Sequence, residues 1–256
     1  MIIAILQARF SSSRLPGKVM KPILGKPMLA LQIERIQRAK LLNKLIVATS
    51  DYDEDNEIAE LCKTLELECF RGNLNDVLDR FYQAAKLYSP EHIVRLTGDC
   101  PLCDPLLIDT LVKFHLADEY DYSCNTFVPT YPDGLDVEIF RSSCLEIAHQ
   151  EAILPSHREH VTQFIHQQPE RFKIGDYRGN IDRSDLRWTV DEQLDFELIT
   201  KIYESIYPQN SGFTTEDILD WLEINPEWKV YNTFYQRNEG LTKSLLADKD
   251  FILNQS

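Results

Sequence analysis

Short apolar segments alternate with amphipathic segments along the first half of the chain, and this alternation limits the fold more than any other feature. Residues 2–6 form a continuous apolar run, and further short strand-like runs lie at 45–48, 68–70 and 92–96. Continuous apolar strands are typical of a parallel sheet that is covered on both faces. Because helical patterns separate the runs, the sequence predicts an α/β fold with a mostly parallel sheet and right-handed crossovers.

The helical patterns complete this outline. Pro27 can open the first of them, because proline is tolerated in the first turn of a helix. Thr214 is suited to cap the last one, since its hydroxyl can accept from a free backbone N–H group. The predicted helices cover residues 27–40, 53–65, 75–87, 105–115, 193–205 and 214–224.

The region of residues 125–187 interrupts the alternation. It contains Pro129, Pro132 and Pro155, among other prolines, and two polar segments with helical spacing, near 141–150 and 156–168. We interpret it as an inserted segment that carries substrate or dimer contacts, after which the alternation resumes with a strand at 186–190. Residues 1–231 are therefore expected to form one domain, and residues 232–256 a peripheral tail.

The charge of the chain is acidic overall but basic at its start. The net charge is −14, yet the first 50 residues hold nine of the 27 basic residues and a single acid, Glu34. An acidic protein is a poor partner for nucleic acid, because a phosphate backbone is held by many basic contacts. A basic segment in such a chain instead indicates a small polyanionic ligand.

The sequence also predicts a cytoplasmic protein. No apolar run approaches the ~20 residues that span a bilayer. The opening run has no basic residue before it and no small-residue cleavage site before Arg9, which makes it a poor signal peptide. The six cysteines are accordingly expected to be free thiols.

A basic loop after the first predicted strand carries the strongest functional signal. Residues 6–18 read LQARFSSSRLPGK, so Arg9, Arg14 and Lys18 surround three consecutive serines. Accessible backbone N–H groups and fixed cations at the carboxyl edge of a parallel sheet form a cradle for phosphate. The spacing fits neither a Walker loop nor a dinucleotide-binding fingerprint.

This loop resembles the N-terminal signature of the sugar nucleotidyltransferases, in particular the CMP-sugar synthetases, which include CMP-Kdo synthetase and the acylneuraminate cytidylyltransferases. The matching residues are Ala8-Arg9, SRLPGK at 13–18 and GKPM at 25–28. Further motifs resemble the branch of the spore coat polysaccharide biosynthesis protein F. They are RGN at 71–73, DVLDRF at 76–81, RLTGDCP at 95–101, REHVT at 158–162 and LRWTVDE at 186–192. The similarity spans residues 1–205.

The resemblance implies a three-layer fold of the nucleotide-diphospho-sugar transferase type, which is related to the GT-A and Rossmann folds. It also implies a homodimer whose inserted segment reaches toward the neighbouring site, and a site for CTP. The residues expected to bind the nucleotide are Leu6, Gln7, Ala8, Arg9, Ser13, Arg14, Lys18, Arg71, Thr97 and Asp99.

Two aspartates that follow predicted strands are expected to bind Mg²⁺. Asp99 follows the strand at 92–96, and Asp191 follows the strand at 186–190. Mg²⁺ prefers oxygen ligands and uses one or two carboxylates together with phosphate oxygens and water. The resemblance assigns metal binding to the equivalents of both residues. Because Asp191 also precedes a predicted helix, a role as helix cap is the alternative.

Thr97 departs from the CMP-Kdo synthetases, which have glutamine at this position. Glutamine can reach the edge of the cytosine base, whereas threonine is shorter. Arg71 resembles a base-contacting arginine of the acylneuraminate enzymes and is the candidate for that contact. The alternative is a surface arginine at the end of a strand.

An acidic turn and a basic segment are candidates for the acceptor site. Asp133, Asp136 and Glu138 match the sugar-side segment of the branch and could bind sugar hydroxyls or amines, although an acidic turn beside a strand is the alternative. Arg158 is chemically suited to a substrate carboxylate. His160 is assigned with it to the substrate or to a subunit interface.

Together these features predict a Mg²⁺-dependent cytidylyltransferase. It would transfer CMP from CTP to a hydroxyl of an acidic sugar, nonulosonic or Kdo-like, and release pyrophosphate in surface polysaccharide biosynthesis. The expected catalytic residues are Arg14, Lys18, Asp99 and Asp191. Two alternatives remain open. One is a GT-A-type glycosyltransferase using a nucleotide-sugar donor, for which Asp51-Tyr-Asp53 and Asp53-Glu-Asp55 fit the Asp-x-Asp string, although both open a predicted helix and resemble capping acids. The other is a non-catalytic nucleotide-binding module.

Overall fold

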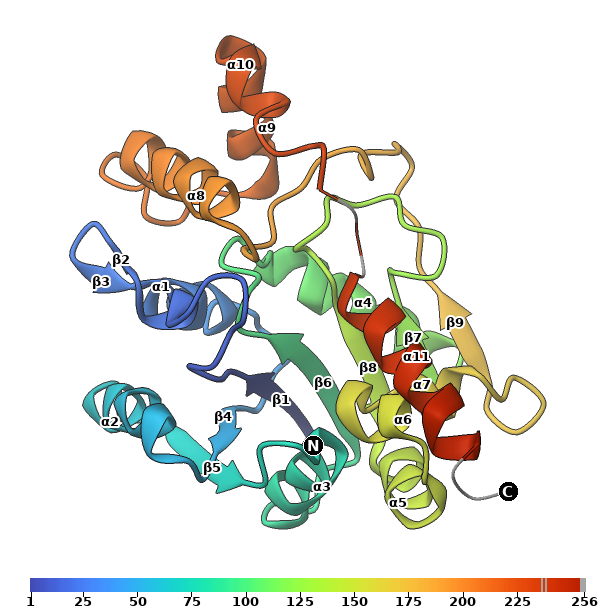
Figure 1. The fold of residues 1–256 in the computed structure, drawn as a ribbon. Coiled ribbons are helices and arrows are strands. Elements are labelled where there is room, and N and C mark those ends of the chain that lie inside the picture. Colours follow the sequence, from blue (N-terminus) through green and yellow to red (C-terminus); the bar gives the residue numbers. More distant parts are fainter. Residues whose placement is uncertain (236, 238, 254–256) are drawn as a thin grey trace.

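A computed structural model describes residues 1–235, 237 and 239–253. A seven-stranded sheet lies at the centre of the protein, with helices around it (Figure 1). The strand order is β5-β4-β1-β6-β8-β7-β9, and a separate two-stranded hairpin follows the basic loop. The strands of the sheet are β1 (Ile2–Gln7), β4 (Lys44–Ser50), β5 (Glu68–Gly72), β6 (His92–Thr97), β7 (Tyr122–Cys124), β8 (Glu138–Arg141) and β9 (Ile174–Asp176); β2 (Pro22–Ile23) and β3 (Lys26–Pro27) form the hairpin.

The first half of the chain forms the predicted parallel sheet. β1 lies between β4 and β6 and pairs with both in parallel, and β5 extends the sheet beside β4. The register sets Gln7, the last residue of β1, opposite Ala48 and Thr97. The loops that follow β1 and β6 therefore begin side by side at one edge of the sheet.

Two hydrophobic cores lie on the two faces of the sheet, which gives the three layers that the sequence predicts. Ala4 and Leu6 of β1 belong to one core, whereas Ile3 and Ile5 belong to the other, because neighbouring strand residues point to opposite faces. The first core includes residues of α1 (Met28–Ile36), α2 (Asn56–Thr64), α4 (Pro105–Ala117), α8 (Gln193–Ile206) and α9 (Thr215–Ile224); the second includes residues of α3 (Val77–Lys86), α5 (Ser142–Glu151) and α7 (Gln163–His166).

The structure confirms the helix cap predicted at Thr214 but not the one considered at Asp191. The Thr214 hydroxyl accepts from the backbone N–H of Asp217, and the Asp217 carboxylate accepts from Thr214 in return, which confirms the predicted cap. The helix after Asp191 is capped by Glu192 and Asp195 instead. The alternative role of Asp191 as helix cap is therefore wrong.

The strand predicted at residues 186–190 is wrong. The segment is extended but makes one isolated bridge, between Asp133 and Arg187. Its backbone groups bond to loops: Trp188 N donates to Asp133 O (2.6 Å) and Val190 N donates to Asp99 O (2.8 Å). Buried Trp188 and Val190 account for the apolar pattern that suggested a strand.

The region of residues 125–187 is not a separate insertion. Within it, β8 pairs antiparallel with β6 and β7, and β9 pairs in parallel with β7, so this region extends the central sheet. The helix predicted at 156–168 is broken into α6 (Pro155–His160) and α7. The break is at Val161, whose φ of 60° is incompatible with a continuous right-handed helix.

The C-terminal segment, expected to be a peripheral tail, instead packs against the rest of the protein. After α10 (Pro226–Lys229), α11 (Glu239–Leu253) lies along α6 (Figure 1). The buried carboxylate of Asp248 accepts from Ser156 N (2.8 Å) and from Ser156 Oγ (2.5 Å). In the part of the chain that the structure describes, the helices lack the combination of length and apolarity that crossing a membrane requires.

This contact predicts a specific loss of stability. Asp248→Ala leaves the buried backbone N–H and hydroxyl of Ser156 without their acceptor, which should lower the free energy of unfolding by about 1–3 kcal/mol. Urea unfolding followed by circular dichroism measures the change. Asp250→Ala removes an exposed carboxylate from the same helix and is the matched control; equal effects of the two substitutions would contradict the anchoring role of Asp248.

Candidate active site

A cavity of about 790 Å³ opens where the loops after β1 and β6 begin. It is the meeting point of the basic loop, the segment after β6 and the acidic turn of residues 131–138. Most of the residues that the sequence predicts for the site line it: Gln7, Ala8, Arg9, Ser13, Arg14, Lys18, Thr97, Asp99, Asp133, Asp136, Glu138, His160 and Asp191.

The ammonium group of Lys18 joins the basic loop to both predicted metal-binding aspartates. Lys18 Nζ lies 2.9 Å from Asp191 Oδ1 and 3.3 Å from Asp99 Oδ2, and it donates to Val190 O at 2.7 Å. Arg14 Nη2 lies 2.8 Å from the same oxygen of Asp191. The four residues expected to be catalytic therefore form one connected group.

Each part of this group is positioned by backbone structure. Gly17 adopts φ +66°, a left-handed conformation that favours glycine, and Lys18 follows it directly. Asp99 follows β6, and its carbonyl accepts from Val190 N, which holds Asp191 beside it. The turn at Gly17 thus positions Lys18, and the hydrogen bond from Val190 N to Asp99 O places the two aspartates side by side.

The charges of this group depend on one another. Burial raises the pKa of the Asp99 carboxyl, but the ammonium of Lys18 and hydrogen bonds from Thr97 and the backbone together lower it by more, and the pKa falls to about 2. Burial likewise lowers the pKa of Lys18, whereas the carboxylates of Asp99 and Asp191 raise it above its usual value. Both the lysine and Asp99 are therefore charged at neutral pH.

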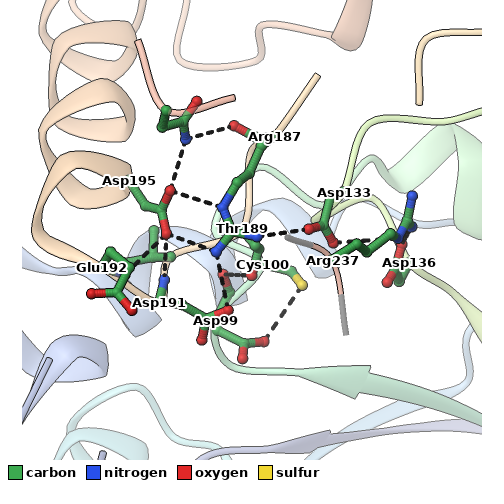
Figure 2. A network of polar contacts seen from close by, with 12 residues as sticks. Asp99, Cys100, Asp133, Asp136, Arg187, Thr189, Asp191, Glu192, Asp195 and Arg237 are labelled. Carbon is green, nitrogen blue, oxygen red and sulfur yellow. Dashed lines mark hydrogen bonds and ion pairs between the residues drawn. The ribbon is translucent and has the colours of Figure 1, made fainter. Parts of the chain in front are cut away.

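The guanidinium of Arg187 holds three aspartates, Asp133, Asp191 and Asp195, in position (Figure 2). Its guanidinium bonds to the fully buried carboxylate of Asp195 at 3.0 and 2.9 Å, and reaches Asp133 at 2.9 Å and Asp191 at 3.3 Å. Asn232 donates to the Arg187 carbonyl at 3.0 Å and to Asp195 at 2.8 Å. Burial lowers the pKa of Arg187, but its carboxylate partners raise it by more. The pKa therefore lies above its usual value, and the side chain is always charged.

The acidic turn is held by an arginine from the C-terminal segment. Arg237 Nη2 lies 2.5 Å from Asp136 Oδ1, and its Nε lies 3.5 Å from Asp133 Oδ1 (Figure 2). Within the turn, Gly134 has φ +105°, and a Cβ there would lie 2.4 Å from Thr189 N, so the turn packs closely on the segment that carries Asp191. Burial raises the pKa of Asp136 and Arg237 opposes the rise. Nearby carboxylates add to the rise, and the pKa reaches about 7.

Glu138 is held by a polar network inside the sheet. It forms an ion pair with Arg95 and accepts hydrogen bonds from the hydroxyls of Tyr122 and Thr162, both at 2.6 Å. Arg95 in turn donates to Gln7 at 3.2 Å. Glu138 lines the cavity as predicted, but its oxygens already accept from the protein's own donors.

Three predicted residues do not reach the cavity. Leu6 is fully buried within β1. Arg71 donates to the carbonyls of Ser50 (2.9 Å) and Tyr52 (2.7 Å), which ties it to the neighbouring strand end. Arg158 pairs with Asp76 through bonds of 2.5–3.1 Å and does not line the cavity, so the structure does not support its expected contact with substrate.

The Asp-x-Asp string also lies elsewhere. Asp51 and Asp53 are exposed and are not among the residues that line the cavity. The nearby buried carboxylate, Asp55, accepts from Ser50 N at 2.9 Å and from Phe10 N at 2.6 Å, which is a structural role. This placement provides no support for a glycosyltransferase metal site.

Several lining residues were not predicted, either because they lie outside the quoted motifs or because nothing in a motif indicated that they face a site. His160, which was predicted, contacts Ser244 of α11 at 2.8 Å, and Ser244 also donates to Glu159 at 2.6 Å. Arg80 and Arg95 were visible within the quoted motifs, but spacing alone did not indicate that they face a site. The unpredicted lining residues include Arg80, Arg95, Tyr122, Phe127, Glu159, Thr162, His166 and Ser244.

Comparison with known proteins was made at the levels of sequence and structure. The sequence model of a family described as cytidylyltransferase matches residues 3–225. An uncharacterized protein of Methanocaldococcus jannaschii is 38% identical over 91% of this chain and 94% of its own length. The spore coat polysaccharide biosynthesis protein SpsF of Bacillus subtilis is 30% identical over 88% of this chain and 95% of its own length.

Solved structures share the fold. A cytidylyltransferase from Leptospira borgpetersenii superposes with a TM-score of 0.86 at 32% identity, covering 92% of this chain and 99% of that one. A CMP:2-keto-3-deoxy-manno-octonic acid synthetase complexed with CTP gives a TM-score of 0.63 at 18% identity, over 80% of this chain and 98% of that one. The second likeness concerns the fold alone.

The raised pKa of Asp136 predicts a pH-dependent stability. An aspartate with a usual pKa of 3.8 that titrates near 7 in the fold keeps a proton which the unfolded chain has already lost. Its unfavourable contribution therefore grows as the pH rises from about 4 to about 7, and is complete above that. Asp136→Asn removes this contribution.

The free energy of unfolding of Asp136→Asn, relative to the natural chain, should thus be higher at pH 8 than at pH 5. Urea titrations with EDTA at both pH values measure it, and Asp220→Asn, an exposed position on α9, is the control. A difference that is constant or reversed between the two pH values would refute the prediction.

Proposed function

The chain belongs to the cytidylyltransferase family, and from that premise we propose that it transfers CMP from CTP to a hydroxyl group of an acidic sugar and releases pyrophosphate. The observation that carries the proposal is the contact of Lys18 with Asp99 and Asp191 at the wall of the cavity. Cations for phosphate and carboxylates for a metal meet there, which is the combination that nucleotidyl transfer requires.

The donor half of the cavity is suited to a nucleoside triphosphate. The loop after β1 supplies Arg14 and Lys18, and its serines line the same wall. A guanidinium can bind two phosphate oxygens, and an ammonium acts as a point charge. We assign Arg14 and Lys18 to the α-phosphate, where negative charge must be neutralised as the acceptor oxygen attacks phosphorus.

Asp99 and Asp191 are the residues that would hold Mg²⁺. Among the described residues, no three His, Cys, Asp or Glu side chains gather into a metal-binding group. Two carboxylates that already share one cation fit Mg²⁺, because it takes its other ligands from phosphate and water. When bound, Mg²⁺ supplies Lewis-acid stabilisation of charge on the phosphate oxygens.

The protein's own contribution is orientation. Arg187 holds Asp191 and Asp133 in fixed positions, and the buried carboxylate of Asp195 holds Arg187. Such a preformed group accelerates transfer by aligning the attacking hydroxyl with phosphorus, without a covalent intermediate on the enzyme. Asp136 lines the acceptor half, where its proton can be exchanged near neutral pH.

The proposed acceptor is a sugar that carries both hydroxyls and a carboxylate, of the nonulosonic or Kdo-like type, for surface polysaccharide biosynthesis. Carboxylates of the acidic turn and the hydroxyl of Thr162 offer partners for sugar hydroxyls, and Arg95 places a cation in the same wall. The names of two relatives support this choice: SpsF of Bacillus subtilis, named for spore coat polysaccharide, and the 3-deoxy-manno-octulosonate cytidylyltransferase of Geobacter sulfurreducens, 36% identical over 43% of this chain and 44% of its own.

Two further features of the proposal concern the molecule as a whole. A homodimer is proposed from the resemblance, and light scattering in solution tests it. A cytoplasmic location is proposed as well, and cell fractionation tests it.

The central experiment incubates the protein with each nucleoside triphosphate, Mg²⁺ and a panel of sugar acids, and measures pyrophosphate. CTP should support release in the presence of at least one acceptor. Asp99→Asn, Asp191→Asn and Lys18→Met should each lower kcat/KM by about a hundredfold or more, because each removes charge stabilisation at the reacting phosphate. Asp220→Asn is the control.

Two results would overturn the proposal. Turnover with UTP or ATP but not with CTP would exclude cytidylyl transfer. Tight binding of CTP without turnover of any acceptor would favour a non-catalytic nucleotide-binding module.

A further inference from the structure

The C-terminal segment contributes one arginine, Arg237, to the acidic turn of residues 131–138. Arg237 lies beyond residue 225, where the family model ends, so membership of the family assigns it no role. Its Nη2 lies 2.5 Å from Asp136 Oδ1, its Nε lies 3.5 Å from Asp133 Oδ1, and its Nη1 donates to the Tyr131 carbonyl at 3.4 Å. It thus contacts the turn at three points, although it does not itself line the cavity.

Most of the carboxylates that line the cavity are already engaged. Asp99 and Asp191 hold the ammonium of the basic loop. Both oxygens of Glu138 accept hydrogen bonds, and both oxygens of Asp133 lie within ion-pair distance of arginines. Glu159 is open to solvent, with 46% of its side chain exposed, and accepts from a serine of α11. These groups are therefore taken up by the protein or by solvent.

Asp136 differs from the other carboxylates of the cavity. Among the described residues, its hydrogen bonds and ion pairs involve Oδ1 alone, and the partner is Arg237. Asp136 lines the cavity, and 31% of its side chain is exposed. Because Arg237 holds one oxygen from outside the cavity, the other oxygen is available to a ligand. Such a carboxylate is suited to accept a proton from a bound hydroxyl group.

Asp136 belongs to the same polar network as the proposed metal ligands (Figure 2). Arg237 joins Asp136 to Asp133. Arg187 then joins Asp133, at 2.9 Å, to Asp191, at 3.3 Å. The available oxygen of Asp136 is thus held in a fixed relation to the carboxylates at which the α-phosphate is proposed to react.

Two histidines also line the cavity but are placed differently. His160 Nε2 bonds to Ser244 of α11 at 2.8 Å. The His166 ring packs against the rings of Phe127 and Tyr122, with centroids 5.3 and 5.9 Å apart. Within the described part of the chain, neither histidine is hydrogen-bonded to the arginines and aspartates of the network in Figure 2. The geometry therefore favours Asp136 over either imidazole as the base.

We propose that Asp136 is the general base that accepts the proton of the attacking hydroxyl, and that Arg237 is the positioning residue that directs it. This inference rests on the proposed function. The proton moves from the acceptor oxygen to Asp136 Oδ2, and that acceptor oxygen forms a bond to the α-phosphorus. The bond from the α-phosphorus to the bridging oxygen breaks, and pyrophosphate leaves with the electron pair. The carboxyl then returns its proton to solvent.

The charges around Asp136 suit it to this role near neutral pH. The titratable and charged groups near it are Arg237, Asp133, Glu138, Asp99 and the thiol of Cys100. Burial raises the pKa of Asp136, the cation of Arg237 opposes the rise, and the carboxylates add to it, so that the pKa is about 7. A base is most effective when its pKa lies near the working pH. Arg237 thus orients the carboxylate and favours its ionised form.

The dependence of kcat on pH tests the base. Pyrophosphate release is measured at saturating CTP and Mg²⁺ with the most active sugar acid of a panel that includes Kdo and N-acetylneuraminic acid. In the natural chain kcat should rise between about pH 6 and pH 8, as Asp136 loses its proton, and then level off. Asp136→Asn should lower kcat at pH 8 by about a hundredfold or more and remove this rise. The KM for CTP should change by less than about twofold.

Two substitutions of Arg237 test the positioning role. Arg237→Met should lower kcat at pH 7 by about tenfold or more and move the rise to higher pH, because the cation that lowers the pKa of Asp136 is lost. Much of the loss should be recovered at pH 9. Arg237→Lys keeps the charge and should keep the rise near its natural position. Arg178→Met breaks an arginine–aspartate pair of 2.6 Å away from the cavity and should leave the profile unchanged.

A direct titration gives a readout that does not require turnover. The pKa of Asp136 is measured by ¹³C NMR of the aspartate carboxyl groups in the full chain, with its signal assigned from its loss in Asp136→Asn. The pKa should be higher in Arg237→Met than in the natural chain. Circular dichroism confirms that each variant is folded, and Asp136→Asn is already expected to be the more stable chain at pH 8.

The outcomes separate this inference from the proposed function. An unchanged pH profile in Asp136→Asn, or an equal loss at every pH in Arg237→Met, would overturn the inference in an active enzyme. An unchanged pKa of Asp136 in Arg237→Met would overturn the positioning role with or without turnover. A raised pKa in a protein that turns over no acceptor would support that positioning role and refute the proposed function.

Discussion

The contact of one buried ammonium with two carboxylates is the interaction on which this structure depends. Lys18 comes from the loop after β1, Asp99 from the segment after β6 and Asp191 from an extended segment far along the chain, and they meet within 3.3 Å. Because charges removed from water must be paired, the three segments can be buried only together. The same contact therefore holds both the sheet edge and the site together.

Two arginines fix the position of the carboxylates around the Lys18 contact. Arg187 bonds to Asp191, Asp133 and Asp195, and Arg237 extends the network to Asp136. Arg237 lies beyond residue 225, where the match to the family model ends. The C-terminal segment, through Arg237 and the Ser244 contact with His160, thus helps to build a cavity to which the N-terminal loop also contributes.

The sequence predicted the architecture well where local pattern and tertiary environment agree. The apolar runs of β1 and β4 became parallel central strands, the resemblance to cytidylyltransferases is confirmed, and Arg14, Lys18, Asp99 and Asp191 converge. Prediction failed where a buried segment takes its hydrogen bonds from loops, as at 186–190. It also failed where strands outside the alternation join the sheet, as β8 and β9 do.

What the sequence by itself determined is the set of features that depend on neighbours in the chain: the alternation of strands and helices, the concentration of positive charge in the loop after β1, the cap at Thr214 and membership of a family. What only the tertiary structure decided is the partner of each arginine. Arg71 and Arg158 were expected in the site but bond to backbone and to Asp76, whereas Arg80, Arg95 and Arg187 were given no role and contribute to it. The physical reason is that a guanidinium has a long reach and five donors, so its partner is chosen by which distant acceptors the fold brings within hydrogen-bond distance.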